Sequence, residues 1–279
     1  MAVLLVPLTF LGQDYAVSES LIAYVEVPKV ALLRLLASLI LLLWALEWAL
    51  KSPTFEGSFP SFSLNTLASS LSPFNLLQAI HRWSSGHSIR WLLLAAGMFF
   101  GSTLISTILS GSFTTSIWGE IPGQDGYSAY TIASYGILLG AIATHLKTPA
   151  QLGRLLGAIV LTGCLVGLYG SFQHFGHDFL NITESTGGGA SGRVTAFQGN
   201  AIFVGAVLSM TVPVTLVASA IHMRNDDWAD WGFLSKIGQV EKDIVATFIW
   251  AILLSTQLLG LIFTFSRGPW AGAVLALAV

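Results

Sequence analysis

Charged side chains are scarce in this sequence. Asp, Glu, Lys and Arg make up 9% of its 279 residues, whereas a soluble domain contains about 25%. The formal net charge is −2, so the chain lacks the basic surface that nucleic-acid binding requires. Hydrophobic residues make up 54% of the chain, and the mean hydropathy is +0.74. This composition predicts an integral membrane protein and excludes nucleic acid as a partner.

Cysteine is also nearly absent. The single cysteine, Cys164, excludes an intrachain disulfide and any CxxC zinc or redox motif. His174 and His177 are three residues apart with only Asp178 close by, which is a weak pattern for a metal site. We therefore predict no metal and no cofactor.

Long apolar runs dominate what is present. A helix needs about 20 apolar residues to cross the roughly 30 Å of hydrocarbon in a bilayer. Six segments meet this length, at residues 30–50, 91–109, 127–146, 152–172, 196–221 and 244–265. They predict an all-α polytopic transmembrane helical bundle, forming a single transmembrane domain over residues 1–279.

Two shorter apolar pieces, at 1–11 and 268–279, are too short to cross the bilayer alone. Because the second one stops inside an apolar run, we expect the chain to be the N-terminal part of a longer protein.

The basic residues predict the orientation, because cytoplasmic loops retain Lys and Arg. Alternate loops contain eight of the twelve, namely Lys51, Arg82, Arg90, Lys147, Arg154, Arg224, Lys236 and Lys242. Loops 51–90, 147–151 and 222–243 are then cytoplasmic. Loops 12–29, 110–126 and 173–195, together with the turn at Ser266, face outward.

Arg267 is the only charged residue between positions 244 and 279. One helix over that stretch would be about 54 Å long, so we expect a break at "SRGPW", where Ser266 suits an N-cap and Pro269 a first turn. The arginine then lies at the N-terminus of a new helix, where carboxylate or phosphate binds well. The alternative is an arginine that only anchors the helix end in the membrane surface.

Two outward loops contain further candidates. Arg193 stands just before the fifth span, and Asn200 lies near the outer end of that span, which repeats the arrangement at Arg267. Around loop 110–126, Trp118 and Tyr127 bring aromatic rings next to polar groups such as Gln124, a combination suited to sugars. Their alternative role is an aromatic belt at the membrane surface.

Five stretches resemble, in order and spacing, the O-antigen ligase/polymerase superfamily of bacterial membrane glycan ligases, over essentially the whole chain. They are "VPKVALLRLLASLILLLWAL", "SIWGEIPGQDGYSAY", "YGSFQHFGHD", "GRVTAFQGNAIFVGAVLSMTVP" and "FTFSRGPWAGA". The chain departs from the family's Gly-Asn-Pro-Asn, because Ala201 and Ile202 follow Gly199 and Asn200.

The resemblance implies an enzyme that moves a glycan from a polyprenyl-diphosphate carrier to a hydroxyl of a glycan, lipid or protein. It implies action at the outer face of the bacterial cytoplasmic (inner) membrane. Arg193 and Arg267 match the family's two arginines and would hold the diphosphate. Candidate substrate-lining residues are Asn200, Trp118, Gln124, Tyr127 and His177. The general base is expected beyond Val279, so residues 1–279 alone are predicted to be inactive.

Two other functions stay open, as does the choice between ligase and polymerase. A secondary transporter of an anionic solute or lipid-linked glycan also uses broken helices and helix ends to bind anions. A non-enzymatic scaffold of the cell envelope is the third possibility.

The predicted orientation is tested by a Gly188→Cys variant. Loop 173–195 is expected outside and Cys164 within a span, so a membrane-impermeant maleimide should label position 188 in intact cells. Labelling that occurs only from the cytoplasmic side would contradict the orientation.

Overall fold

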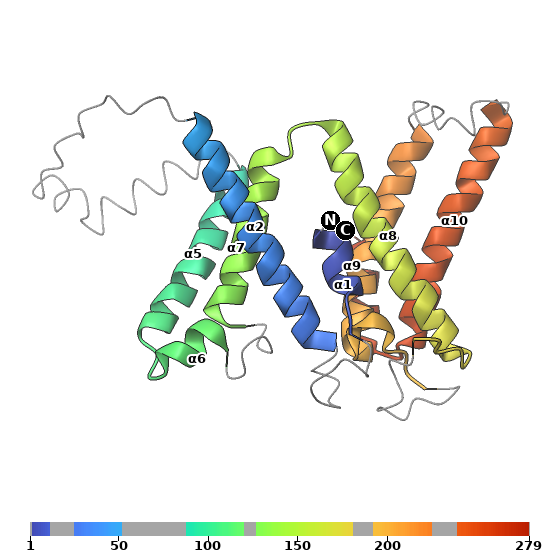
Figure 1. Cartoon of the computed structure of the whole chain (residues 1–279). Coiled ribbons are helices and arrows are strands. Elements are labelled where there is room, and N and C mark those ends of the chain that lie inside the picture. Colours follow the sequence, from blue (N-terminus) through green and yellow to red (C-terminus); the bar gives the residue numbers. More distant parts are fainter. Residues whose placement is uncertain are drawn as a thin grey trace, which may run out of the picture. The chain divides into compact units, whose positions relative to one another are not determined.

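The computed structural model describes residues 2–11, 25–51, 88–119, 127–180, 192–224 and 239–278. Within these ranges every regular element is a helix (Figure 1), which confirms the predicted all-α fold. Four helices contain stretches long and apolar enough to cross a membrane, at Val27–Glu47, Pro149–His174, Ala201–His222 and Asp243–Phe263. The chain is therefore a multi-pass membrane protein.

The helices belong to two compact units, divided inside α2 and inside α7. Unit 1 contains residues 1–36 and 141–279, and unit 2 contains residues 37–140. Unit 1 includes α1 (Ala2–Leu8), the start of α2 (Val27–Lys51), α8 (Pro149–His174), η4 (Ala196–Gln198), α9 (Ala201–Arg224), α10 (Gln239–Phe263) and α11 (Arg267–Ala278). Unit 2 includes the rest of α2, α5 (Ser88–Ile108), α6 (Phe113–Trp118) and most of α7 (Ala129–His145). The single domain stays a prediction.

A helix lies at each of the six predicted ranges, and the largest difference concerns the fifth. That helix, α9, begins at Ala201 rather than near residue 196. A short 3-10 helix, η4, occupies Ala196–Gln198 instead. The Asn200 side chain accepts a hydrogen bond from the Ile202 amide at 2.9 Å, which is the geometry of a helix N-cap. The sequence contains a signal for this boundary, because Gln198, Gly199 and Asn200 interrupt the apolar run directly before α9.

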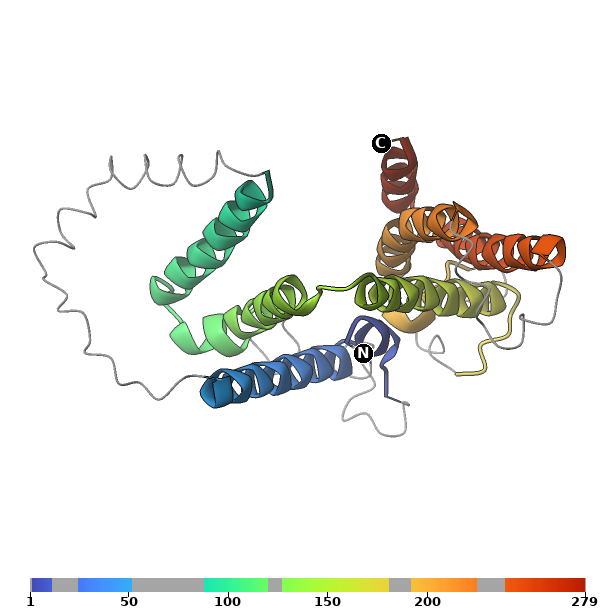
Figure 2. The same cartoon turned by 90° about the horizontal axis from the view of Figure 1, so that it is seen from above.

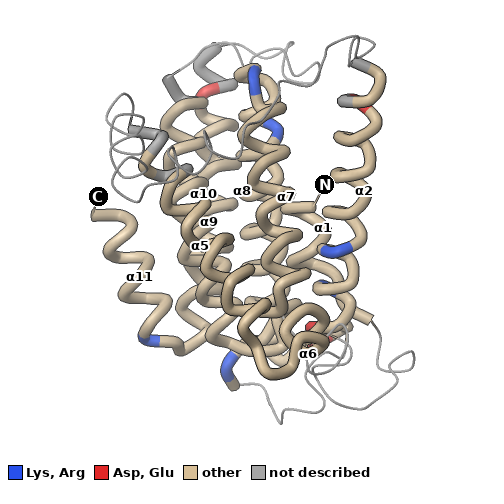
Figure 3. The backbone as a smooth tube through the Cα atoms, turned by 90° about the vertical axis from the view of Figure 1, so that its left-hand side faces the viewer, with Lys and Arg blue, Asp and Glu red and all other residues tan. Residues whose placement is uncertain are grey.

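Charged residues lie mostly near helix ends, and long stretches of helix between them carry none (Figure 3). This distribution is expected where the helix centres lie in hydrocarbon.

Close packing of α8, α9 and α10 holds unit 1 together (Figure 2). A Cβ atom on Gly167 would lie 2.5 Å from the Thr256 carbonyl oxygen, and one on Gly260 would lie 2.6 Å from the Gly167 Cα. Small residues at such contacts let helix backbones approach, which is how membrane helices gain packing energy without a hydrophobic effect between them.

A buried amide adds polar contacts to the same helices. Gln257 of α10 is fully buried; its Nε2 donates to Thr215 Oγ1 of α9 at 2.8 Å and to the Val160 carbonyl of α8 at 3.4 Å. Interhelical hydrogen bonds of this kind contribute on average about 0.6 kcal/mol each in membrane proteins.

The apolar core of unit 1 lies where α8, α9, α10 and α11 meet the segment before α9. Its buried residues include Val166, Tyr169, Val194, Ala196, Val204, Leu208, Leu261 and Ala273. On α9, a Cβ on Gly205 would lie 2.6 Å from the Pro269 Cβ, so α11 packs directly on the α9 backbone. Residues 194–196 and α11 thus pack against this core.

Gly167→Ala tests the glycine contact. Because the added methyl group would meet backbone rather than a movable side chain, we expect a loss of stability of about 1–3 kcal/mol. The matched control is Gly157→Ala on the same helix, where a Cβ meets nothing within 4 Å. Thermal unfolding in detergent should show a lower Tm for Gly167→Ala only. Equal Tm values for both variants would contradict the packing.

Candidate functional site

The end of α8, the segment before α9 and the end of α10 lie together at one end of unit 1. The amide of Val194 donates to the Phe263 carbonyl at 3.3 Å, which joins the segment before α9 to the end of α10. The His174 ring, at the end of α8, stacks on the Phe263 ring with the centroids 3.8 Å apart. The side of the membrane on which they lie stays a prediction.

The predicted break occurs in the turn of residues 264–266, between α10 and α11. Thr264 Oγ1 donates to the Leu261 carbonyl at 2.7 Å and accepts from the Ser266 amide at 3.3 Å. The Trp270 indole also donates to the Leu261 carbonyl, at 2.8 Å. Phe265 has a φ of 49°, a conformation that costs about 1–3 kcal/mol for such a residue. The contacts around it hold the turn in this shape.

Arg193 binds this turn from a distant part of the sequence. Its Nε donates to the Thr264 carbonyl at 3.1 Å, and its Nη2 donates to Ser266 Oγ at 2.8 Å. A guanidinium has further N–H donors that these two contacts leave unused. Arg193 therefore holds the turn and brings a positive charge to it.

Arg267, the residue after Ser266, is the first residue of α11 and is exposed. The first amides of a helix have no acceptor within the helix, and the helix dipole adds positive potential there. A Cβ on Gly268 would have nothing within 4 Å, so the backbone beside Arg267 faces open space. The structure thus brings both predicted arginines to the same turn, at a helix N-terminus.

A second strained residue lies in the neighbouring segment. Ala196 has a φ of 39° and, with Phe265, is one of the two non-glycine residues with positive φ in the described part of the chain. The buried Gln173 side chain holds it, because its Oε1 accepts from the amides of Thr195 at 3.3 Å and Ala196 at 2.7 Å. Strained backbone of this kind clusters at functional sites.

Lys29, which is not among the predicted site residues, is a third cation near this segment. Its amine donates to the Phe197 carbonyl and to Gln198 Oε1, the latter at 2.9 Å. Gln198 Nε2 in turn donates to the Pro7 carbonyl at 2.8 Å. The available signal was a lysine in the first turn of an apolar helix, where a charge is costly and is kept for a purpose.

The structure places two other candidates at the same end of unit 1. Asn200 is exposed, and its side-chain oxygen caps α9. His177 is exposed, and its amide donates to the Phe172 carbonyl at 2.9 Å. The ring that stacks on Phe263, at the end of α10, is that of His174.

The remaining candidates belong to unit 2 or lie outside the described residues. Trp118 packs edge to face on Tyr130, with the ring centroids 5.5 Å apart. The Tyr127 side chain is 90% exposed. Gln124 lies outside the described residues. The predicted set is thus divided between the two units.

No family model, no curated protein and no solved structure matches this chain. Among the residues that the structure describes, no group of three or more His, Cys, Asp and Glu side chains is placed to hold a metal ion. The fold and the site define a multi-pass α-helical membrane protein with a cationic turn at one end of its helices.

Proposed function

We propose that the chain belongs to a membrane glycan ligase or polymerase. It transfers a glycan from a polyprenyl-diphosphate carrier to an acceptor hydroxyl at the outer face of the bacterial cytoplasmic membrane. The observation that supports this most is the contact of the Arg193 guanidinium with Thr264 and Ser266, directly before Arg267.

The chemistry of the leaving group explains why two arginines are needed. When the glycosidic bond to the carrier breaks, negative charge develops on the diphosphate, and fixed positive groups lower the barrier. Arginine binds phosphate oxygens through two parallel N–H donors, which also fixes the orientation of the ligand. The first amides of α11 provide further donors at the same place.

Nearby buried polar atoms also support a ligand here. Among the described residues, Gln173 Nε2, His174 Nδ1 and Thr195 Oγ1 are buried without a hydrogen-bond partner. Such groups are uncommon in folded proteins and call for an explanation. A ligand group or water that enters this end of unit 1 would provide one.

The position of the site favours transfer over transport. The candidate spans end at His174 and Phe263, and the arginines lie at or beyond those ends. Secondary transporters bind their substrates near the middle of the bilayer. A site at the helix ends instead suits a lipid-linked donor whose diphosphate lies at the membrane surface.

Substitution of the two arginines tests the proposal in cells in which glycan transfer depends on this protein. Arg193→Ala and Arg267→Ala should each lower glycan transfer by about 10²–10³-fold, the typical cost of losing one oxyanion donor. The polyprenyl-linked donor should accumulate. Lysine at either position should restore little activity, because a point charge does not reproduce the two parallel donors. Glycan transfer and lipid-linked donor are measured together.

Two controls separate binding from folding. Arg154→Ala removes an exposed arginine at the other end of α8 and should leave transfer unchanged. Ser266→Ala removes one contact of Arg193 but keeps both charges, so it should cost less than either arginine. Near-normal transfer in both arginine-to-alanine variants would overturn the proposal.

A further inference from the structure

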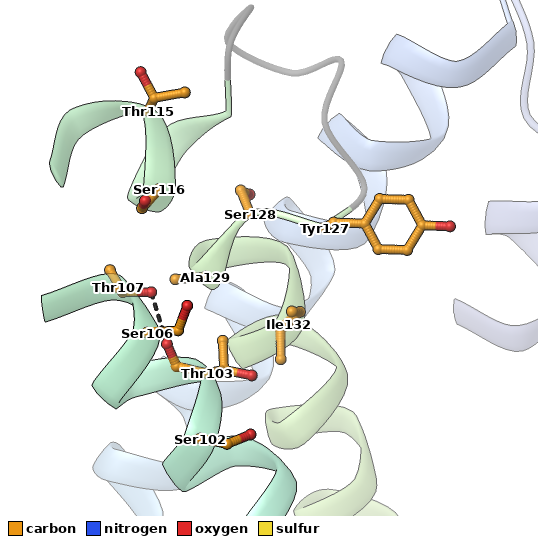
Figure 4. A pocket seen from close by; sticks show the side chains of 10 residues that line it. All are labelled: Ser102, Thr103, Ser106, Thr107, Thr115, Ser116, Tyr127, Ser128, Ala129 and Ile132. Atoms are coloured by element: carbon orange, nitrogen blue, oxygen red, sulfur yellow. Dashed lines mark hydrogen bonds between the residues drawn. The ribbon is translucent and has the colours of Figure 1, made fainter. Parts of the chain in front are cut away.

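Unit 2 contains a cavity of about 550 Å³ between α5, α6 and the start of α7 (Figure 4). Hydroxyl side chains dominate it, because eight of the ten lining residues are Ser, Thr or Tyr. None of the ten carries a charge. The ring of Tyr127 points away from the other hydroxyls, so serines and threonines make the polar surface (Figure 4).

The hydroxyls of α5 present oxygen lone pairs to this cavity. Ser102 Oγ and Thr103 Oγ1 donate to the Phe99 carbonyl at 2.8 and 3.0 Å, and Thr107 Oγ1 donates to the Thr103 carbonyl at 2.8 Å. A hydroxyl has one proton, so each of these oxygens can only accept from a ligand. The cavity therefore suits a ligand that is rich in hydrogen-bond donors.

A second cavity, of about 410 Å³, adjoins the first one. The two cavities share three lining residues, Thr103, Ala129 and Ile132. From there the second cavity follows α7 as far as Gly140, and its lining is almost entirely apolar. A polar cavity and an apolar groove thus lie next to each other, with three lining residues in common and linings of different chemistry.

Two glycines of α7 let aromatic rings approach the helix backbone. A Cβ on Gly136 would lie 3.1 Å from the Phe100 ring, and one on Gly140 would lie 3.3 Å from the Trp44 ring. The aromatic rings therefore lie against bare backbone and form the walls of the groove.

The groove has the length of one membrane leaflet. Ala129 and Gly140 are both lining residues, and the helix between them rises by about 17 Å. The hydrocarbon of a whole bilayer is about 30 Å thick. Since residues 127–146 are predicted to cross the membrane, one lipid tail that lies along α7 would extend from the hydroxyl cavity to about the middle of the bilayer.

We propose that this site binds a lipid with a neutral sugar headgroup. The sugar hydroxyls donate to the Ser and Thr oxygens of the cavity, and one tail lies in the groove along α7. A phosphate-bearing headgroup is disfavoured, because it has acceptors where the cavity also presents acceptors and no positive charge. The site uses none of the residues of the arginine turn and does not depend on diphosphate binding there.

Two photoreactive lipids test the proposal on the unmodified protein. The purified chain in phosphatidylcholine nanodiscs is irradiated with an alkyl β-glucoside that carries a diazirine in its tail. The comparison probe has the same tail and a phosphocholine headgroup. Because the hydroxyls of the cavity distinguish the headgroups, labelling of residues 132–140 by the glucoside should exceed that by phosphocholine at least about fivefold. Labelled peptides are quantified by mass spectrometry.

Four variants locate the two parts of the ligand. Thr103→Val removes a lining hydroxyl and should lower glucoside labelling about two- to tenfold, whereas Thr114→Val, at an exposed threonine of α6 outside the lining, should not. Ala133→Phe fills the groove and should abolish labelling. Its control, Ala95→Phe, places the same ring at an exposed position of α5 outside the groove.

Three results would overturn the proposal. Equal labelling by the two probes would mean that the groove holds ordinary membrane lipid. Glucoside labelling that survives Ala133→Phe would place the tail elsewhere. An absence of labelling on α7 by either probe would mean that another protein segment occupies the groove.

Discussion

The backbone at the break between α10 and α11 must find hydrogen-bond partners within the protein, because Thr264 and Ser266 are buried. The carbonyl of Thr264 accepts from Arg193, and the carbonyl of Leu261 accepts from Trp270 and Thr264. The hydrogen bond from Arg193 gives the Thr264 carbonyl its partner. The same hydrogen bond brings Arg193 to the start of α11. Structure and proposed chemistry therefore depend on the same guanidinium, and the close packing of α8, α9 and α10 keeps its partners in place.

The two proposed sites recognise opposite chemistry. The arginine turn of unit 1 offers charged N–H donors and a helix N-terminus, which select an anion. The cavity of unit 2 offers hydroxyl oxygens and no charge, which select a neutral donor-rich headgroup. A glycan transferase that acts on lipids needs both abilities, since its donor carries a diphosphate and its products carry sugars.

Much of the fold follows from apolar runs, and the break at residues 264–266 follows from the length of the last run and from its Ser, Gly and Pro. That Arg193 and Arg267 belong to one side was predictable from the order of the spans. Their meeting was expected only from the resemblance, because Arg193 and Thr264 are 71 residues apart. The start of α9 was predicted too early, although Gln198, Gly199 and Asn200 interrupt the apolar run there. Of the hydroxyl cavity only Tyr127 was predicted, because the serines and threonines come from distant parts of the sequence and individually resemble ordinary helical residues.

Direct binding of a short-chain polyprenyl diphosphate to the purified protein tests the central claim, that the arginine turn is an anion site for the lipid carrier. Isothermal titration in neutral detergent should show the diphosphate binding at least about tenfold more tightly than the polyprenyl alcohol with the same chain, since charge-assisted hydrogen bonds contribute about 1.5–3 kcal/mol each. The difference should shrink as salt is added. Equal affinities for the diphosphate and the alcohol at low salt would contradict the account.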